Sequence, residues 1–177
     1  MSKNVMVIGT GTIGEPLIGL LAEHKDALGL EEILFFKRTP LSDEKGKVEA
    51  LLRKGAKIVS TSDVISDFKK LGFSDIEDVE KAYKDAGVII DCTPSGNENW
   101  ENIYSTLDQS KRFMAQGSEH GFGPFFAWGI NNDVLENGSN KYLIASCNTH
   151  NIASIIKTFA LDQSRELVEG QFVCLRR

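Results

Sequence analysis

The sequence predicts an α/β fold built on a doubly wound, mainly parallel sheet, and three observations support this prediction. Short apolar runs, such as residues 5–8, 33–36 and 88–91, are typical of strands that are buried in a parallel sheet. Segments with apolar residues at helical spacing separate several of these runs. A glycine-rich turn, Gly9–Gly14, joins the first run to the first helical segment. Strands that alternate with helices favour a parallel sheet covered by helices.

Composition and charge exclude several classes of protein. The chain has 177 residues, of which 41% are hydrophobic and 25% charged, and this is enough for one sizeable domain. A net charge of −5 without a basic face argues against nucleic-acid binding. No apolar run reaches the roughly 18 residues of a membrane span. The cysteines (Cys92, Cys147 and Cys174) have neither metal-ligand spacing nor a disulfide pattern, so we expect no metal site and a reducing, cytoplasmic setting.

The first strand, 5–8, runs directly into a complete G-x-G-x-x-G sequence at the start of a helix. This context is typical of a dinucleotide-binding turn in a Rossmann-type fold. Gly9 permits the tight turn, Gly11 lets the backbone approach a pyrophosphate, and Gly14 lets the helix pack closely on the strand. The phosphates would then lie at the helix N-terminus. The alternative is a glycine turn without a ligand.

The second strand, 33–36, ends in Lys37, Arg38 and Thr39, where NAD-dependent enzymes usually carry an acidic residue for the ribose 2′-hydroxyl. Cations at this point attract a 2′-phosphate, whereas a carboxylate repels it. These three residues therefore favour NADP, or the use of both NADP and NAD. A solvated basic turn is the alternative.

The next segment carries structure but no evident chemistry. Polar periodicity predicts a helix over 43–54, and a short strand follows at 57–60. A second helix reaches about residue 70. The sequence Ser74-Asp75-Ile76-Glu77 has the form of a capping box, which predicts that a helix begins there and continues to Gly87.

Polar residues follow the buried strand at 88–91. Asp91 and Thr93 lie at its carboxyl end, the edge at which open α/β sheets bind ligands. Cys92, between them, is expected to point into the core. A helix over about 99–107 leads to a strand at 112–116, which Gly117 follows.

A cysteine at the junction of a strand and a helix is the main candidate for chemistry. The run 142–145 predicts a strand, and 152–160 has helical periodicity, so Cys147 lies near a helix N-terminus. Free amides and the helix dipole there favour a thiolate. A buried structural cysteine is the alternative. His120 is a candidate base or an exposed loop residue, and residues 169–177 predict a further strand.

In this order, these motifs resemble those of archaeal-type (type II) glyceraldehyde-3-phosphate dehydrogenase. The resemblance is most specific at Ser146-Cys147-Asn148-Thr149 and extends over about the first half of such an enzyme. It implies residues 1–146 as the NAD(P)-binding domain, and 147–177 as the start of a truncated catalytic domain. Where the family usually has Thr-Gly, this chain has His150-Asn151, and His150 either perturbs the thiolate or faces solvent.

The resemblance also implies roles for individual residues. Cys147 would be the nucleophile, and three neighbours would surround the substrate: Ser146, Asn148 and Thr149. The cofactor would contact the following residues: Gly9, Gly11, Thr12, Ile13, Gly14, Lys37, Arg38, Thr39, Thr93, Gly117 and Arg177. The catalytic histidine would lie in the half that this sequence lacks, so we expect the isolated chain to be inactive.

The implied reaction is the phosphorylating oxidation of D-glyceraldehyde 3-phosphate to 1,3-bisphosphoglycerate and its reverse, in glycolysis and gluconeogenesis. The implied cofactors are NADP and NAD, the substrates are the phosphorylated aldehyde and inorganic phosphate, and the full-length enzyme would be a homotetramer. Two alternatives stay open: a related thiol-dependent semialdehyde or acyl-phosphate dehydrogenase, and a non-catalytic NADP-binding module.

Overall fold

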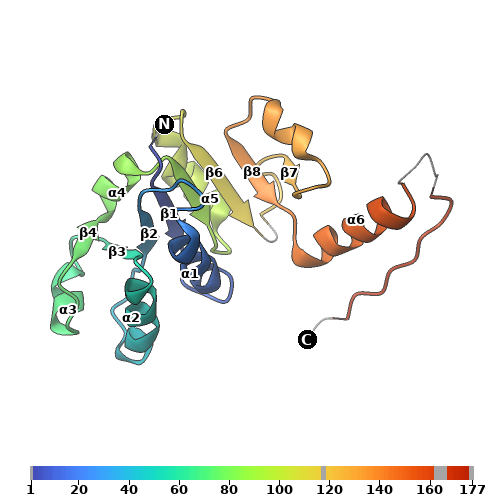
Figure 1. The fold of residues 1–177 in the computed structure, drawn as a ribbon. Helices are drawn as coiled ribbons and strands as arrows, with labels where there is room; N and C mark the ends of the chain where they lie inside the picture. The colour runs from blue at the N-terminus through green and yellow to red at the C-terminus, as the bar shows by residue number, and fades with distance from the viewer. Residues whose placement is uncertain (1, 117–118, 162–166, 176–177) are drawn as a thin grey trace.

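The computed structural model describes residues 2–116, 119–161 and 167–175. Its centre is one eight-stranded sheet in which every paired strand is parallel (Figure 1). The predicted α/β, Rossmann-type doubly wound architecture is therefore confirmed. The strands are β1 (Val5–Ile8), β2 (Ile33–Phe36), β3 (Lys57–Ser60), β4 (Ile76–Asp78), β5 (Val88–Asp91), β6 (Arg112–Gln116), β7 (Phe125–Phe126) and β8 (Lys141–Ile144).

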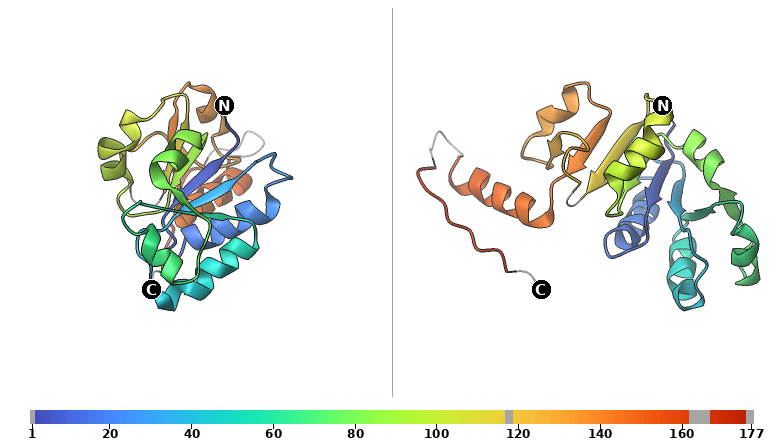
Figure 2. Two further views of the ribbon diagram at one scale, coloured as in Figure 1. Left: turned by 90° about the vertical axis from the view of Figure 1, so that its left-hand side faces the viewer. Right: turned by 180° about the vertical axis from the view of Figure 1, so that it is seen from behind.

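Helices cover both faces of the sheet (Figure 2). Alternate residues of β1 show why, because Val5 and Val7 join one buried cluster and Met6 and Ile8 join the other. The first cluster includes residues of α1, α2 and α3, and the second includes residues of α4 and Tyr104. The helices are α1 (Gly14–His24), η1 (Ser42–Glu44), α2 (Lys45–Arg53), α3 (Ile65–Lys70), α4 (Val79–Asp85), α5 (Gly96–Asn102), η2 (Tyr104–Thr106), η3 (Asn132–Glu136) and α6 (Cys147–Phe159).

The strand order, β4-β3-β2-β1-β5-β6-β8-β7, places the chain reversal between β1 and β5. The chain builds the sheet outward from β1 to β4 and then returns to the other side of β1. Such a switch point is where open parallel sheets bind ligands, at the carboxyl ends of the strands. Ile8 pairs with Asp91 and Gln116 pairs with Ile144, so four strands end along one edge.

Two predicted elements are wrong. The segment 74–77 does not start a helix: Ile76 pairs with Ile58 in the sheet, and the helix begins at Val79. Asp78 is its N-cap, and the carboxylate accepts a hydrogen bond from the Glu80 amide at 2.9 Å. Residues 167–175 form no strand, and they lie in an exposed, irregular segment.

Helix α6 extends away from the sheet, and none of its residues is buried (Figure 1). No helix among the described residues is long and apolar enough to cross a membrane. The described residues contain no cluster of three or more side chains suited to hold a metal ion. The predicted domain boundary between residues 146 and 147 stays a prediction.

Candidate functional site

The turn after β1 has the geometry that the glycine pattern predicts. Gly9 has a φ of +93°, a backbone conformation that residues with a side chain rarely adopt. A Cβ on Gly14 would lie 1.9 Å from the carbonyl oxygen of Gly9, so only glycine permits this approach of helix to strand. At Gly11 an added Cβ would meet no atom within 4 Å. The space above Gly11 is thus open to a ligand.

Helix α1 begins beside this turn. The amides of Thr12 and Ile13 donate to no oxygen among the residues that the structure describes, and Ile13 is 54% exposed. Unpaired amides at a helix N-terminus, together with the helix dipole, form a binding site for an anion such as a pyrophosphate. Contacts of Thr12 and Ile13 with a cofactor stay a prediction.

The end of β5 is held by a buried carboxylate. Asp91 is fully buried and accepts hydrogen bonds from the Thr93 amide at 2.8 Å and the Thr93 hydroxyl at 2.6 Å. Its second oxygen accepts from Asn99 Nδ2 and from the Tyr104 hydroxyl, both at 2.7 Å. Burial and the adjacent charge of Asp91 raise the pKa of Tyr104 well above its usual range. The network fixes the loop that passes beside the glycine turn.

Thr93 itself contacts that turn. A Cβ on Gly9 would lie 3.0 Å from its methyl carbon, and its hydroxyl is bonded to Asp91. The side chain of Thr93 is thus engaged in positioning the loop. A contact of Thr93 with the cofactor stays a prediction.

The two cationic residues at the end of β2 differ in their environment, because Lys37 is buried and Arg38 is exposed. Lys37 is 8% exposed and its ammonium forms an ion pair with Glu44 of η1. The hydrogen bond from Lys37 holds the pKa of the Glu44 carboxyl below its usual value. Arg38 and Thr39 are exposed, and Arg38 forms no ion pair with a described residue. Glu44 lies in a polar segment without a motif, so no sequence pattern indicates it.

The end of β6 meets the loop after β5. Gln116 Nε2 donates a hydrogen bond to the Cys92 sulfur at 2.7 Å. Cys92 packs against the apolar cluster below α1, and burial, followed by the charge of Asp91, raises its pKa to about 12. The structural role predicted for Cys92 agrees with this environment. The predicted cofactor residues Gly117 and Arg177 lie outside the described residues.

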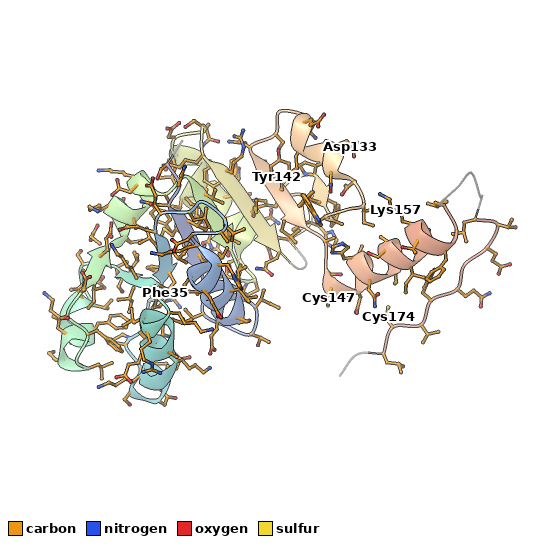
Figure 3. All side chains as sticks on the ribbon, in the orientation of Figure 1. Phe35, Asp133, Tyr142, Cys147, Lys157 and Cys174 are labelled. Carbon is orange, nitrogen blue, oxygen red and sulfur yellow. The ribbon has the colours of Figure 1, made fainter. Side chains whose placement is uncertain are left out.

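Cys147 lies at the first position of α6, and two residues separate it from the end of β8 (Figure 3). The side chain is exposed. Ser146 is the N-cap: its hydroxyl oxygen accepts a hydrogen bond from the Thr149 amide at 3.3 Å and lies 2.9 Å from the Thr149 hydroxyl. Asn148 is half-buried. The thiol therefore lies exposed at the N-terminus of a thirteen-residue helix.

His150 is half-buried and contacts a neighbouring turn, and an effect of this residue on the Cys147 thiol stays a prediction. Its Nε2 lies 3.0 Å from the carbonyl oxygen of Trp128, within hydrogen-bonding distance. Lys157, two turns further along α6, donates to the carbonyl oxygen of Gly129 at 2.5 Å. Both side chains thus tie α6 to the turn after β7. His120 packs its ring edge against Phe125, with 5.7 Å between the ring centroids.

The sheet brings the candidate residues to one edge but not into contact. Cys147 follows β8 and the glycine turn follows β1, and β5 and β6 lie between them. Three steps between strands at about 4.8 Å give about 14 Å between the two points. An extended ligand could therefore lie across the ends of β1, β5 and β6 and approach the thiol.

Comparison with known proteins confirms the resemblance. The glyceraldehyde-3-phosphate dehydrogenase of Pyrobaculum calidifontis is 29% identical over 161 residues, which cover 89% of this chain and 44% of the relative. The enzyme of the same name from Sulfolobus acidocaldarius is 29% identical over 173 residues, or 96% of this chain and 47% of the relative. The chain thus spans about half the length of the curated relatives that it matches.

A solved structure shows the same fold. Aspartate semialdehyde dehydrogenase II of Vibrio cholerae, complexed with ASA, aligns with a TM-score of 0.53 at 10% sequence identity, over 89% of this chain and 46% of the other. At that identity the likeness shows the fold alone. No protein-family model matches the chain.

Proposed function

We propose that the chain is the nucleotide-binding half of a phosphorylating glyceraldehyde-3-phosphate dehydrogenase that uses NADP or NAD. One observation carries the proposal: Cys147, at a helix N-terminus, lies on the same sheet edge as the glycine turn. Both features lie within the 96% of the chain that matches the Sulfolobus acidocaldarius enzyme of that name at 29% identity. By analogy with that enzyme, the substrate would be D-glyceraldehyde 3-phosphate.

The chain fits a dinucleotide at the switch point of the sheet. The open space above Gly11 admits the pyrophosphate, and the amides of Thr12 and Ile13 are free to donate to it. The hydrogen bonds of Asp91 hold the loop after β5 against the glycine turn. The surface that would contact the cofactor is thereby fixed. When bound, the nicotinamide would accept the hydride that the reaction releases.

The thiol supplies the covalent step. The Cys147 thiolate would attack the aldehyde carbon and form a C–S bond, giving a thiohemiacetal. Loss of a hydride from carbon and of the hydroxyl proton to a base leaves a thioester on Cys147. Attack by inorganic phosphate then breaks the C–S bond and forms 1,3-bisphosphoglycerate, which frees the thiolate. Amides at the start of α6 would stabilise the oxygen charge that develops.

No histidine of this chain is suited to act as the base on the described geometry. The ring of His150 is engaged with the Trp128 carbonyl, and His120 packs against Phe125. His24 lies at the end of α1 and is exposed. The base is therefore expected from the part of the relatives that this chain does not match. We expect the isolated chain to bind NADP weakly and to turn over no substrate.

The proposal is tested on the natural protein, whose intact mass shows whether it extends beyond this sequence. The assay follows NADP reduction by D-glyceraldehyde 3-phosphate with and without inorganic phosphate, and hydroxylamine traps the acyl phosphate. We expect phosphate-dependent activity that Cys147→Ser abolishes, in a homotetramer. Activity with aspartate semialdehyde but not with the phosphorylated aldehyde would overturn the assigned substrate. Nucleotide binding without any turnover would favour a non-catalytic module.

Robust turnover by the isolated 177 residues would contradict the assignment of the base. The binding half of the proposal has its own measurement: calorimetric titration of this chain with NADP and NAD. The matched control is Cys147→Ser, which should leave both dissociation constants within about twofold of those of the unsubstituted chain, because the thiol contacts the substrate and not the nucleotide phosphates.

A further inference from the structure

We propose that Glu44 sets the balance between NADP and NAD through its ion pair with Lys37. This inference rests on the proposed function, because it concerns the nucleotide that the glycine turn would bind. The relevant acid in NAD enzymes lies at the end of the second strand, where this chain has Lys37. The fold supplies a carboxylate to the same place from a different element, η1.

The position of Lys37 is fixed at the backbone. Its amide donates to the Val59 carbonyl at 2.9 Å, and its carbonyl accepts from the buried Ser60 hydroxyl at 2.7 Å. The backbone is thus held by β3, and only the side chain can reorient. Its ammonium is ion-paired with the carboxylate of Glu44, whose side chain is 28% exposed.

The ion pair lies beside the glycine turn. Lys37 and Glu44 line a small pocket together with Thr10, the residue between the first two glycines of the turn. The walls of the pocket include Glu15 and Lys47, which are themselves 3.5 Å apart in a second ion pair. Because the ends of β1 and β2 flank this pocket, the ion pair lies beside the place at which the adenosine ribose of a dinucleotide would bind.

The pair gives each nucleotide a different interaction. A ribose 2′-hydroxyl can donate to the Glu44 carboxylate while Lys37 stays paired, so NAD binding needs no rearrangement. A 2′-phosphate would attract Lys37 but would meet the negative charge of Glu44. NADP must therefore compete with Glu44 for the ammonium. We expect the unsubstituted chain to bind both nucleotides with affinities within about tenfold of each other, equivalent to about 1.4 kcal/mol.

The experiment compares four nucleotides by calorimetric titration of the chain: NADP, NAD, 2′,5′-ADP and 5′-AMP. The last two contain only the adenosine half, so they report on this pocket independently of the dehydrogenase chemistry. Glu44→Gln should shift the affinity ratio of NADP to NAD about tenfold towards NADP, and the ratio of 2′,5′-ADP to 5′-AMP in the same direction. Glu44→Ala is the second variant, with the same expected direction, should Glu44→Gln fail to fold.

Two controls make the result specific. Glu49→Gln removes an equal charge from α2, at a carboxylate that lies 3.7 Å from Lys45, and should leave both ratios within twofold. In a Lys37→Met background, Glu44→Gln should raise the preference for the 2′-phosphate by a smaller factor, because only the direct repulsion between Glu44 and the phosphate is then relieved and no ammonium is released. A merely structural role for Glu44 would change the unfolding temperature but not this coupling.

The outcomes separate the two proposals. If the chain bound none of the four nucleotides, the proposed function would be wrong and this inference would fall with it. If it bound them and Glu44→Gln moved neither ratio beyond twofold, the inference alone would be wrong. An equal shift in Glu49→Gln, or a shift that is as large in the Lys37→Met background as in the unsubstituted chain, would also overturn it.

Discussion

A Cβ on Gly14 would lie 1.9 Å from the carbonyl oxygen of Gly9, and this contact joins the first helix to the first strand of the sheet. The obstructing atom belongs to the backbone, so a side chain at Gly14 can be accommodated only if α1 moves. We expect Gly14→Ala to lower the free energy of unfolding by about 3 kcal/mol, measured by urea denaturation. The variant should also lose dinucleotide binding, because the helix N-terminus moves.

Gly11→Ala is the matched control, since an added Cβ there meets no atom within 4 Å. Its φ lies outside the left-handed region, so alanine should leave stability unchanged or raise it by less than about 1 kcal/mol. The same Cβ would occupy the space of the pyrophosphate and weaken NADP binding at least about tenfold. Unchanged binding in Gly11→Ala would show that the ligand does not approach this turn.

The Tyr104 hydroxyl donates to the buried Asp91 carboxylate at 2.7 Å. Tyr104→Phe removes a hydrogen bond to a charged group and should lower the free energy of unfolding by about 2 kcal/mol. Tyr142→Phe is the comparison, because Tyr142 is also buried but donates to a neutral oxygen, the Ser139 carbonyl, at 2.6 Å. Its expected cost is about 1 kcal/mol. Equal losses in urea denaturation would argue against a special role for Asp91.

Local sequence patterns predicted most of the fold, because the backbone conformation of a turn, strand or helix limits which residues can occupy each position. The glycine turn has the required φ at Gly9 and close approach at Gly14, as the spacing of the motif indicates. The capping-box prediction at 74–77 was wrong because pairing with β3 overrides local preference: Ile76 lies opposite Ile58. Only the tertiary structure could decide between a helix start and a strand at this segment.

The candidate site was less predictable, for a physical reason. Glu44 lies seven residues beyond Lys37 in a polar segment without a motif, and the ion pair exists only because the loop folds back over β2. Likewise, His150 has no sequence neighbour that could indicate its contact with the Trp128 carbonyl. A search for carboxylates able to reach the cations at 37–38 would have raised Glu44 as a candidate.

The two cysteines of the sheet edge should differ in reactivity. Cys147 is exposed at a helix N-terminus, whereas burial and the charge of Asp91 raise the pKa of Cys92 to about 12. We expect iodoacetamide at pH 8 to modify Cys147 at least about tenfold faster than Cys92 in the folded chain. Peptide mass spectrometry measures both rates. Equal rates in urea and unequal rates in buffer would assign the difference to the fold, whereas equal rates in buffer would contradict it.

The raised pKa of Cys92 also predicts a pH dependence of stability. Its ordinary pKa is 9.0, so the thiol ionises in the unfolded chain while it stays protonated in the folded one. Its contribution to stability is therefore complete below pH 9 and is lost as the pH rises from 9 towards 12. Cys92→Ala should make the free energy of unfolding fall less steeply over this interval. Tyr83 also has a pKa raised to about 12, but its effect on the free energy of unfolding is the same in Cys92→Ala and in the unsubstituted chain.

The exposed face of α6 predicts self-association. Phe159 is 73% exposed, Ile155 lies one turn before it, and Trp128 of the neighbouring turn is 70% exposed. Apolar side chains gathered on one protruding helix favour contacts between molecules. We expect the mass from light scattering to rise with protein concentration, and Phe159→Ser to reduce that rise. Leu28→Ser removes an equally apolar but distant exposed side chain and should have no effect, and a monodisperse monomer at all concentrations would contradict the prediction.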